Sequence, residues 1–184
     1  MGSENPDWVQ LDEHVVFEPL SPDVQAPSRA TSQSAGYDVR AHLTRGAVRV
    51  WPASAAEPVK IEPAEPPKSE AVAVEIVLQP GDRALIPTGF RARLPDGYEA
   101  QIRIRSSMAW KRGLTVPNAP GTVDADYPDE WFVLVLNSSD RPQKIGHGER
   151  IAQVVLNRFE TADWTEGSVA RSTERDGGLG STGT

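Results

Sequence analysis

The feature that most constrains the fold is a series of short runs in which apolar and polar residues alternate, separated by turns rich in Pro and Gly. Residues 98–105 show the clearest alternation, and Pro95-Asp96-Gly97 directly before them is a turn signal. A period of two is typical of a strand with one buried face, whereas a helix needs a period near 3.6. The chain is therefore predicted to consist mainly of β-strands.

Similar runs predict further strands at residues 14–18, 35–41, 72–78, 84–87, 89–94 and 150–159. Residues 131–136 are continuously apolar, so we expect that strand to be buried on both faces. Many short strands joined by Pro and Gly turns predict an all-β jelly-roll or closed β-barrel. The 184 residues are enough for one domain with its own core.

The segment 44–70 differs from the rest because it is rich in Pro and poor in alternation. Val48–Trp51 fits a short strand, but residues 53–69 are expected to run over the surface as an insertion. We interpret this insertion as a flexible loop, with a partner-binding or lid element as the less favoured alternative. The predicted organisation is a lead-in at 1–13, a β domain at 14–166 and a Gly-rich arm at 167–184.

Composition excludes several classes of protein. The absence of Cys rules out a disulfide scaffold, a thiolate zinc site and a cysteine nucleophile, and it suits the cytoplasm, or the host cytoplasm if the source is viral. A net charge of −7 argues against nucleic-acid binding through a broad basic surface. No apolar run is long enough to enter a membrane as a span, and the acidic start resembles no targeting peptide. His14, His42 and His147 share no ligand spacing, so we expect them at the surface.

One short helix is predicted at residues 108–112, with Ser106-Ser107 as its N-cap and Gly113 as its end. Arg105 precedes it with a guanidinium group suited to phosphate oxygens. Together with the N–H groups of a helix start, this is a candidate phosphate site. Ordinary capping beside a surface Arg is the simpler interpretation of these residues taken alone.

The segment from Gly121 to Tyr127 places two carboxylates close together. If the segment is extended, Asp124 and Asp126 point the same way, because side chains alternate along a strand. Such a pair can bind a cation, or one member can act as a general base. An acidic surface turn is the common alternative.

These segments, with three others, resemble the homotrimeric dUTP pyrophosphatases (dUTPases), whose five ordered motifs the chain carries. The first motif is Ala35-Gly36-Tyr37-Asp38, the second Arg105-Ser106-Ser107-Met108-Ala109, and the third Asn118 with Gly121 to Tyr127. The fourth is Gly148-Glu149-Arg150-Ile151-Ala152-Gln153, and the fifth Arg175 with Gly177-Gly178-Leu179-Gly180-Ser181-Thr182-Gly183. One such motif is a weak signal, but five in the right order are a strong one.

The resemblance implies an enzyme that hydrolyses dUTP to dUMP and pyrophosphate, which keeps uracil out of DNA. It implies a distorted jelly-roll with one short helix, whose C-terminal arm is exchanged within a trimer that shares its active sites. Asp124 would be the general base for water attack on the α-phosphorus. Asp38 would hold the Mg²⁺ cofactor through bound water, as expected for an ion that gives up water reluctantly.

The resemblance also implies the substrate-binding residues. The phosphate chain would be held by Arg105, Ser106, Ser107 and Gln153. The uracil edge would be read by Asn118 and the backbone of Gly121, Thr122 and Val123. Tyr127 would pack on the deoxyribose. The arm would fold over the substrate with Arg175, Gly178 and Leu179.

Two departures from the family pattern leave alternatives open. Leu179 stands where the family commonly has an aromatic residue, and the stretch after Arg175 is one residue short, which makes Arg171 a rival for the phosphate contact. A second candidate function is a dCTP deaminase of the same superfold, which needs a glutamate such as Glu130 at the base. A third is a non-hydrolytic nucleotide-binding or regulatory module.

Overall fold

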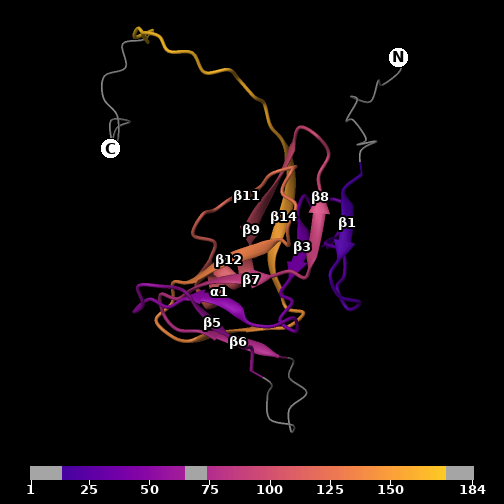
Figure 1. The fold of residues 1–184 in the computed structure, drawn as a ribbon, viewed down its shortest axis with the longest axis vertical. Coiled ribbons are helices and arrows are strands. Elements are labelled where there is room, and N and C mark those ends of the chain that lie inside the picture. The colour runs from indigo at the N-terminus through magenta and orange to yellow at the C-terminus, as the bar shows by residue number, and fades with distance from the viewer. Residues whose placement is uncertain (1–13, 65–73, 173–184) are drawn as a thin grey trace.

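The computed structural model of the chain describes residues 14–64 and 74–172 (Figure 1). Its single described helix is α1 (Ser106–Arg112). Its strands are β1 (Val16–Pro19), β2 (Ser28–Arg29), β3 (Tyr37–Arg40), β4 (Val48–Trp51), β5 (Val59–Ile61), β6 (Glu75–Leu78), β7 (Arg83–Pro87), β8 (Phe90–Arg93), β9 (Tyr98–Ile104), β10 (Leu114–Thr115), β11 (Gly121–Val123), β12 (Phe132–Asn137), β13 (Gln143–Gly146) and β14 (Arg150–Arg158). The predicted all-β fold with one short helix is confirmed.

Two five-stranded sheets form the body of the domain. One has the strand order β10-β12-β7-β4-β5 and the other β11-β9-β14-β3-β2, with the two-stranded sheets β1-β8 and β13-β6 beside them. Every paired strand is antiparallel. In Figure 1 the β12 and β7 strands cross the direction of β9 and β14, as in a jelly-roll.

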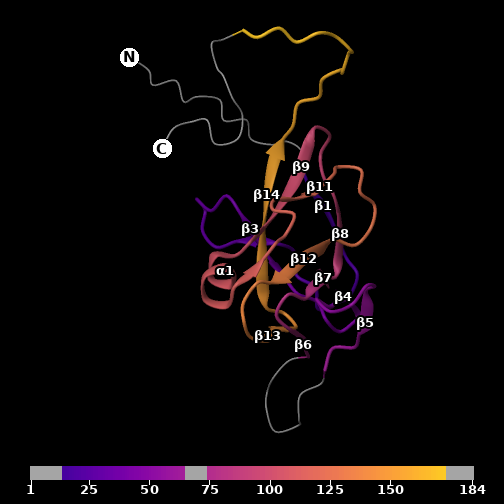
Figure 2. The same ribbon diagram turned by 90° about the vertical axis from the view of Figure 1, so that its left-hand side faces the viewer.

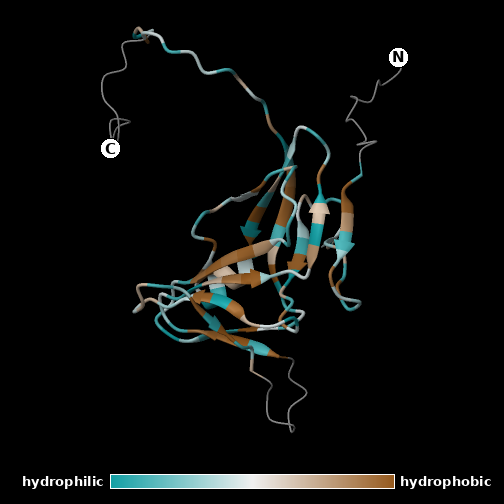
Figure 3. Cartoon of the chain, viewed as in Figure 1, coloured by the Kyte–Doolittle hydropathy of each residue, from teal (hydrophilic) through white to brown (hydrophobic). Residues whose placement is uncertain are grey.

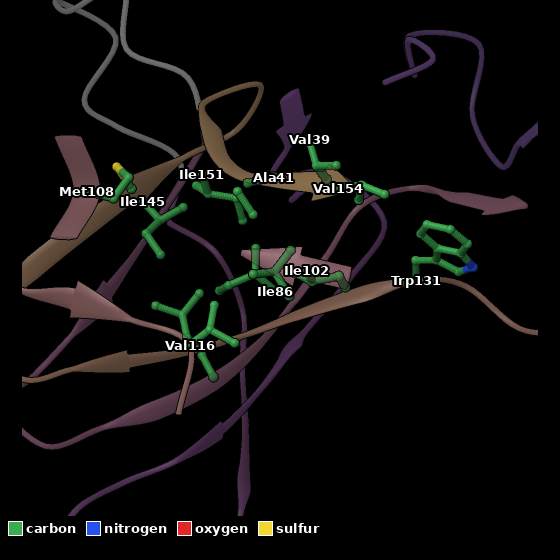
Figure 4. Close-up of a cluster of buried hydrophobic side chains, with 14 of the residues drawn as sticks. Val39, Ala41, Ile86, Ile102, Met108, Val116, Trp131, Ile145, Ile151 and Val154 are labelled. Carbon is green, nitrogen blue, oxygen red and sulfur yellow. The ribbon is translucent and has the colours of Figure 1, made fainter. Parts of the chain in front are cut away.

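The core lies between these sheets and follows the alternation of the sequence. In β9 the alternate residues Tyr98, Ala100 and Ile102 are buried. Figure 3 shows the apolar colour concentrated on the strands and the polar colour on the loops. Figure 4 shows Met108 of α1 near Ile145 at one end of the core and Trp131 at the other, so the helix is anchored to the sheets by its one buried residue.

The expectation of a surface insertion is partly wrong. The short strand expected at Val48–Trp51 is confirmed as β4, but it lies inside a sheet, between β5 and β7, and its Val48 and Val50 are fully buried. Strand β5 pairs with β4 at the edge of that sheet, within the segment for which the sequence predicted no strand. The Pro residues 52 and 58 lie just outside the two strands, where the lack of a backbone N–H removes no hydrogen bond between strands.

The prediction that residues 131–136 are buried on both faces is also wrong. Val133, Val135 and Asn137 are fully buried, but Phe132 and Leu134 are half-buried and line a cavity. Apolar residues therefore occupy both faces of β12 because one face forms the core and the other a pocket.

The histidines do not all lie at the surface. His14 is exposed, but His42 is only 4% exposed and His147 is half-buried, close to it. The expectation of three surface histidines is wrong for these two, because the fold joins segments that the sequence keeps 104 positions apart.

The segment 159–172 follows β14 without regular structure and with every residue exposed. Figures 1 and 2 show it leaving the body of the domain. The lead-in at 1–13 and most of the predicted arm lie outside the described residues. Among the described parts of the chain, no helix has the length and apolar character that a membrane crossing requires.

Candidate active site

The first part of the site surrounds the carboxylate of Asp38, whose side chain is only 6% exposed. Arg150 donates to its Oδ2 at 2.9 Å, and Gln153 donates to its Oδ1 at 3.2 Å. Nε of Arg105 lies 3.2 Å from the same Oδ1 as an ion pair. We call Asp38, Arg105, Arg150 and Gln153 the Asp38 cluster. It brings together three of the predicted site residues and adds Arg150.

The sheet register explains the Asp38 cluster. Gln153 on β14 is the direct partner of Asp38 on β3, and Arg105 directly follows β9, the other neighbour of β14. Gly36 matters here, because a Cβ at that position would lie 3.1 Å from both Cβ and Oε1 of Gln153. A larger residue at this position would force the Gln153 side chain to shift. Sequence reasoning missed Arg150, although it lies in the same run as Gln153.

Helix α1 begins directly beside the Asp38 cluster. Its N-cap is Arg105 in extended conformation, without a side-chain capping bond, so the prediction that Ser106-Ser107 caps the helix is wrong. Both serines lie in the first turn and are exposed, and that turn carries no acid. Gly113 ends the helix in the left-handed conformation, as predicted, with φ of 64°. The serine hydroxyls are therefore accessible to a ligand rather than used for capping.

The Asp38 cluster fits a metal ion that is held through water. A carboxylate offers about four acceptor positions, and hydrogen bonds from Arg150 and Gln153 use two of them, while Nε of Arg105 pairs with it by charge without a hydrogen bond. Direct ligation would place a cation against two guanidinium groups. A remaining acceptor position suits a hydrogen bond from the hydration shell of Mg²⁺, which prefers to keep its waters.

The second part of the site is a cavity of about 280 Å³ at the hairpin that contains β11. It collects the predicted base, amide and aromatic residues of the third motif. The lining includes Asn118, Gly121, Thr122, Val123, Asp124 and Tyr127. Arg49 of β4 also lines it and stacks over Phe132, 5.5 Å from the ring centroid. Sequence reasoning missed Arg49, because no local pattern links the strand at 48–51 to the residues of the third motif.

The two acids of this segment do not act as a pair. A turn follows β11, in which the N–H of Tyr127 donates to the carbonyl of Asp124 at 3.2 Å. The turn ends the strand alternation, so Asp124 lines the hairpin cavity while Asp126 lines a different one beside β1 and β8. The expectation that both carboxylates point the same way is wrong.

The two parts of the site lie toward opposite ends of β9. Val123 pairs with Ala100, so Asp124 lies level with the start of β9, whereas Arg105 directly follows its end. At about 3.3 Å per residue, the six positions from residue 99 to residue 105 amount to roughly 20 Å. Figure 2 shows α1 and the loop after β11 on different sides of β9. Within one chain, the Asp38 cluster and Asp124 do not share a pocket.

Some predicted residues lie elsewhere. Arg171 is exposed in the segment that leaves the body. Arg175, Gly178 and Leu179 lie outside the described residues. Glu130, the residue of the deaminase alternative, accepts a hydrogen bond from the N–H of Gly89 at 2.8 Å and lies 3.7 Å from Arg45. Both of its oxygens therefore have structural partners.

Comparisons with known proteins show which family the chain resembles. The dUTPase family model matches residues 71–183. The deoxyuridine 5'-triphosphate nucleotidohydrolase of Solibacter usitatus (strain Ellin6076) is 44% identical over 122 residues, which make up 66% of this chain and 83% of the relative.

Solved structures show the same fold. The dUTPase of Streptococcus mutans is 26% identical with a TM-score of 0.56, over 80% of this chain and 98% of that one. A mutant dUTPase of phage 80alpha is 22% identical with a TM-score of 0.67, over 92% and 98%. A mutant dUTPase of phage phi11 of S. aureus, described for its structural Mg(II) ion, is 19% identical with a TM-score of 0.62, over 86% and 99%.

The family match covers four of the five motifs, from the one at Arg105 to the arm, and the relative with 44% identity acts on dUTP by name. The chain belongs to the dUTPase family and hydrolyses dUTP.

Proposed function

We propose that the chain splits dUTP into dUMP and pyrophosphate at active sites that are shared between the subunits of a homotrimer. The observation that carries this proposal is the separation of Asp124 from the Asp38 cluster along β9. The residues that contact the base, the α-phosphorus and the phosphate chain must lie around the same bound nucleotide. A neighbouring copy that brings its Asp38 cluster to the hairpin cavity supplies that arrangement.

At the hairpin cavity, Asp124 is the general base that takes a proton from the attacking water. The carboxylate is exposed, so water reaches it directly. Asn118 and the backbone of Gly121, Thr122 and Val123 pair with the uracil edge. Tyr127 packs against the deoxyribose. A positioned general base contributes about 10²–10⁴-fold to the rate of such a reaction.

At the Asp38 cluster, Arg105, Ser106, Ser107 and Gln153 bind the phosphate chain. Arg105 must then turn from Asp38 toward the phosphates, and Arg150 remains to balance the buried carboxylate. Asp38 holds Mg²⁺ through a bound water. The ion neutralises phosphate charge when it is bound, and its removal by EDTA should stop turnover until Mg²⁺ is restored.

The arm completes the site. Arg175, Gly178 and Leu179 close over the nucleotide bound at a neighbouring subunit, with Arg171 as the alternative phosphate contact. The extended course of residues 159–172 away from the body supports an exchange between subunits. The cytoplasmic location stays a prediction from the absence of Cys in the sequence.

The shared site is tested by mixing two inactive variants. Asp124→Asn removes the base from the hairpin cavity, and Arg105→Ala damages the phosphate side. Equimolar mixtures are unfolded and refolded together, and pyrophosphate release from dUTP with Mg²⁺ is measured. Random assembly pairs an intact cavity with an intact cluster at about one quarter of the shared sites, so about a quarter of the wild-type activity should return.

The control leaves each variant in its own trimer. The same variants assayed directly after mixing without unfolding, before their subunits exchange, should give no recovery. A co-refolded mixture that stays inactive would show that both parts work within one chain. Ammonia release from dCTP would instead support the deaminase, and the absence of any product would support a non-hydrolytic module.

A further inference from the structure

Asp23, His42 and His147 come from distant parts of the sequence and meet beyond the end of β3. Nε2 of His42 lies 3.2 Å from Oδ1 of Asp23, and Nε2 of His147 lies 3.2 Å from its Oδ2. The two imidazole rings pack edge to face, with centroids 5.0 Å apart. One half-exposed carboxylate therefore joins a buried and a half-buried histidine.

The hydrogen bonds around the rings fix where their protons lie. The N–H of Leu43 donates to Nδ1 of His147 at 3.1 Å, so this nitrogen holds a lone pair and the proton of the neutral ring is on Nε2. Nδ1 of His42 is buried without a partner among the described residues. A proton there would be a buried donor without an acceptor, so it also belongs on Nε2. Both rings then donate to Asp23.

This protonation distinguishes the cluster from a metal site. The three possible ligand atoms lie within 4.8 Å of one another, a spacing that a zinc site also needs. A metal-bound histidine, however, uses one bare ring nitrogen and donates the proton of the other. In His147 the second nitrogen accepts a hydrogen bond instead. The group is thus a hydrogen-bonded clamp, which we call the Asp23 clamp.

The Asp23 clamp ties together two of the three segments that carry the Asp38 cluster, those of Asp38 and Arg150. The N–H of Ala41 donates to the carbonyl of Glu149 at 2.9 Å, and the N–H of Gly148 donates to the carbonyl of Ala41 at 2.7 Å. Arg40 adds a bond to the carbonyl of Gly148 at 2.7 Å. These bonds lie between His42 and Asp38 on one segment, and between His147 and Arg150 on the other.

The clamp and Asp38 also line one small cavity. Asp23, His42, His147 and Asp38 all belong to the lining of a cavity of about 40 Å³. Gly89 leaves room for the clamp, because a Cβ there would lie 2.7 Å from both Cγ of His42 and Cγ2 of Val24. Its φ of +77° also suits glycine. Loss of the clamp therefore acts on the backbone that positions Asp38 and Arg150.

We propose that Asp23, acting through His42 and His147, is a positioning residue for the binding of the triphosphate of dUTP. This inference rests on the assignment of the Asp38 cluster to the phosphates. It predicts a defect in substrate affinity rather than in the chemical step, because the clamp contacts no reacting group.

The test is Asp23→Asn in the full chain. An amide offers one oxygen acceptor, so only one Nε2–H keeps its partner. For His147 a change of tautomer would break the bond from Leu43. We expect the KM for dUTP to rise about three- to tenfold while kcat stays within about twofold, as for the loss of uniform binding. Binding of the non-hydrolysable analogue dUpNHpp should weaken more than binding of dUMP.

Two variants make the outcome decisive. Asp96→Asn, on an exposed turn away from the clamp, should leave KM unchanged. Arg105→Ala should weaken the binding of dUpNHpp if the Asp38 cluster binds phosphate. Weaker dUpNHpp binding in Arg105→Ala but not in Asp23→Asn overturns the clamp alone, whereas unchanged dUpNHpp binding in both overturns the phosphate assignment. A fall in kcat with unchanged KM would indicate only a loss of folded enzyme, and it too overturns the proposal.

Long-range ¹⁵N NMR of the histidine side chains supplies a second readout. Both rings of the clamp should carry a proton on Nε2, and one equivalent of Zn²⁺ should leave their signals unchanged. A proton on Nδ1 of His147, or a shift of both rings with Zn²⁺, would contradict the clamp.

Discussion

The guanidinium of Arg150 donates a hydrogen bond to Oδ2 of Asp38 at 2.9 Å, across 112 positions of sequence. The carboxylate is almost fully buried, so both of its oxygens require partners. Arg150 contacts only Oδ2, and Gln153 and Arg105 contact the other oxygen. In the proposed function, this arrangement keeps a negative charge beside the phosphates while two guanidinium groups offset its repulsion of them. It makes Arg150 part of the site although the sequence motifs alone did not single it out.

Arg150→Gln should reduce kcat/KM for dUTP. The change leaves the buried Asp38 with less compensation, and Arg105 is then held more firmly by Asp38 and is less available to the phosphates. A hydrogen bond to a charged group contributes about 1.5–3 kcal/mol, and the half-exposed position of Arg150 favours a loss of about tenfold. Steady-state pyrophosphate release measures this change in kcat/KM. The exposed Arg93→Gln on β8 is the matched control and should retain full activity.

Asp124→Asn should abolish turnover while nucleotide binding persists. The amide keeps the shape of the side chain but does not accept the proton of the attacking water, so kcat should fall by about 10²–10⁴-fold. Titration with dUpNHpp should give nearly unchanged affinity. Asp126→Asn provides the comparison, because Asp126 lines a different cavity. Equal loss of activity in both variants would argue against Asp124 as the base.

Val50→Ala should destabilise the fold, because Val50 is fully buried in the interior strand β4. The lost burial and the cavity left behind cost about 1–3 kcal/mol of the free energy of unfolding. Val59→Ala in the edge strand β5 removes a side chain that is 42% exposed, and it should cost less than about 0.5 kcal/mol. Urea unfolding at one fixed protein concentration compares the two. Similar losses would contradict the assignment of β4 to the core.

The stability of the protein should fall in acid partly through Asp23. Hydrogen bonds from Ser21 and His42 hold the pKa of Asp23 well below its usual value of 3.8. The unfolded chain therefore takes up a proton first as the pH falls through about 4, and the stabilisation by ionised Asp23 is present above that pH and lost below it. Melting temperatures between pH 6 and pH 3, roughly the range that brackets this titration, should decline less steeply in Asp23→Asn.

The comparison variant for this acid effect is Asp96→Asn, whose decline should match the wild type. A wild-type slope in Asp23→Asn would mean that the Asp23 clamp contributes nothing to the loss of stability in acid.

The sequence by itself determined the class of fold and the family. Alternation in residues 98–105 and the turn at Pro95-Asp96-Gly97 are local signals, and they needed no partner to predict β9. The helix end at Gly113 was predictable for the same reason. The motifs are also local, which is why their order alone identified a dUTPase. Local reasoning failed at β5, where a three-residue strand within Pro-rich sequence carries too short a pattern.

Tertiary structure decided everything that depends on distant contacts. Only the register of β3, β9 and β14 brings Arg105, Arg150 and Gln153 to one carboxylate. Only the turn after β11 sends Asp124 and Asp126 into different cavities. The clamp of Asp23 with His42 and His147 has no sequence spacing that reveals it. Side chains that meet across strands are fixed by pairing and packing, and that information is absent from any short stretch of sequence.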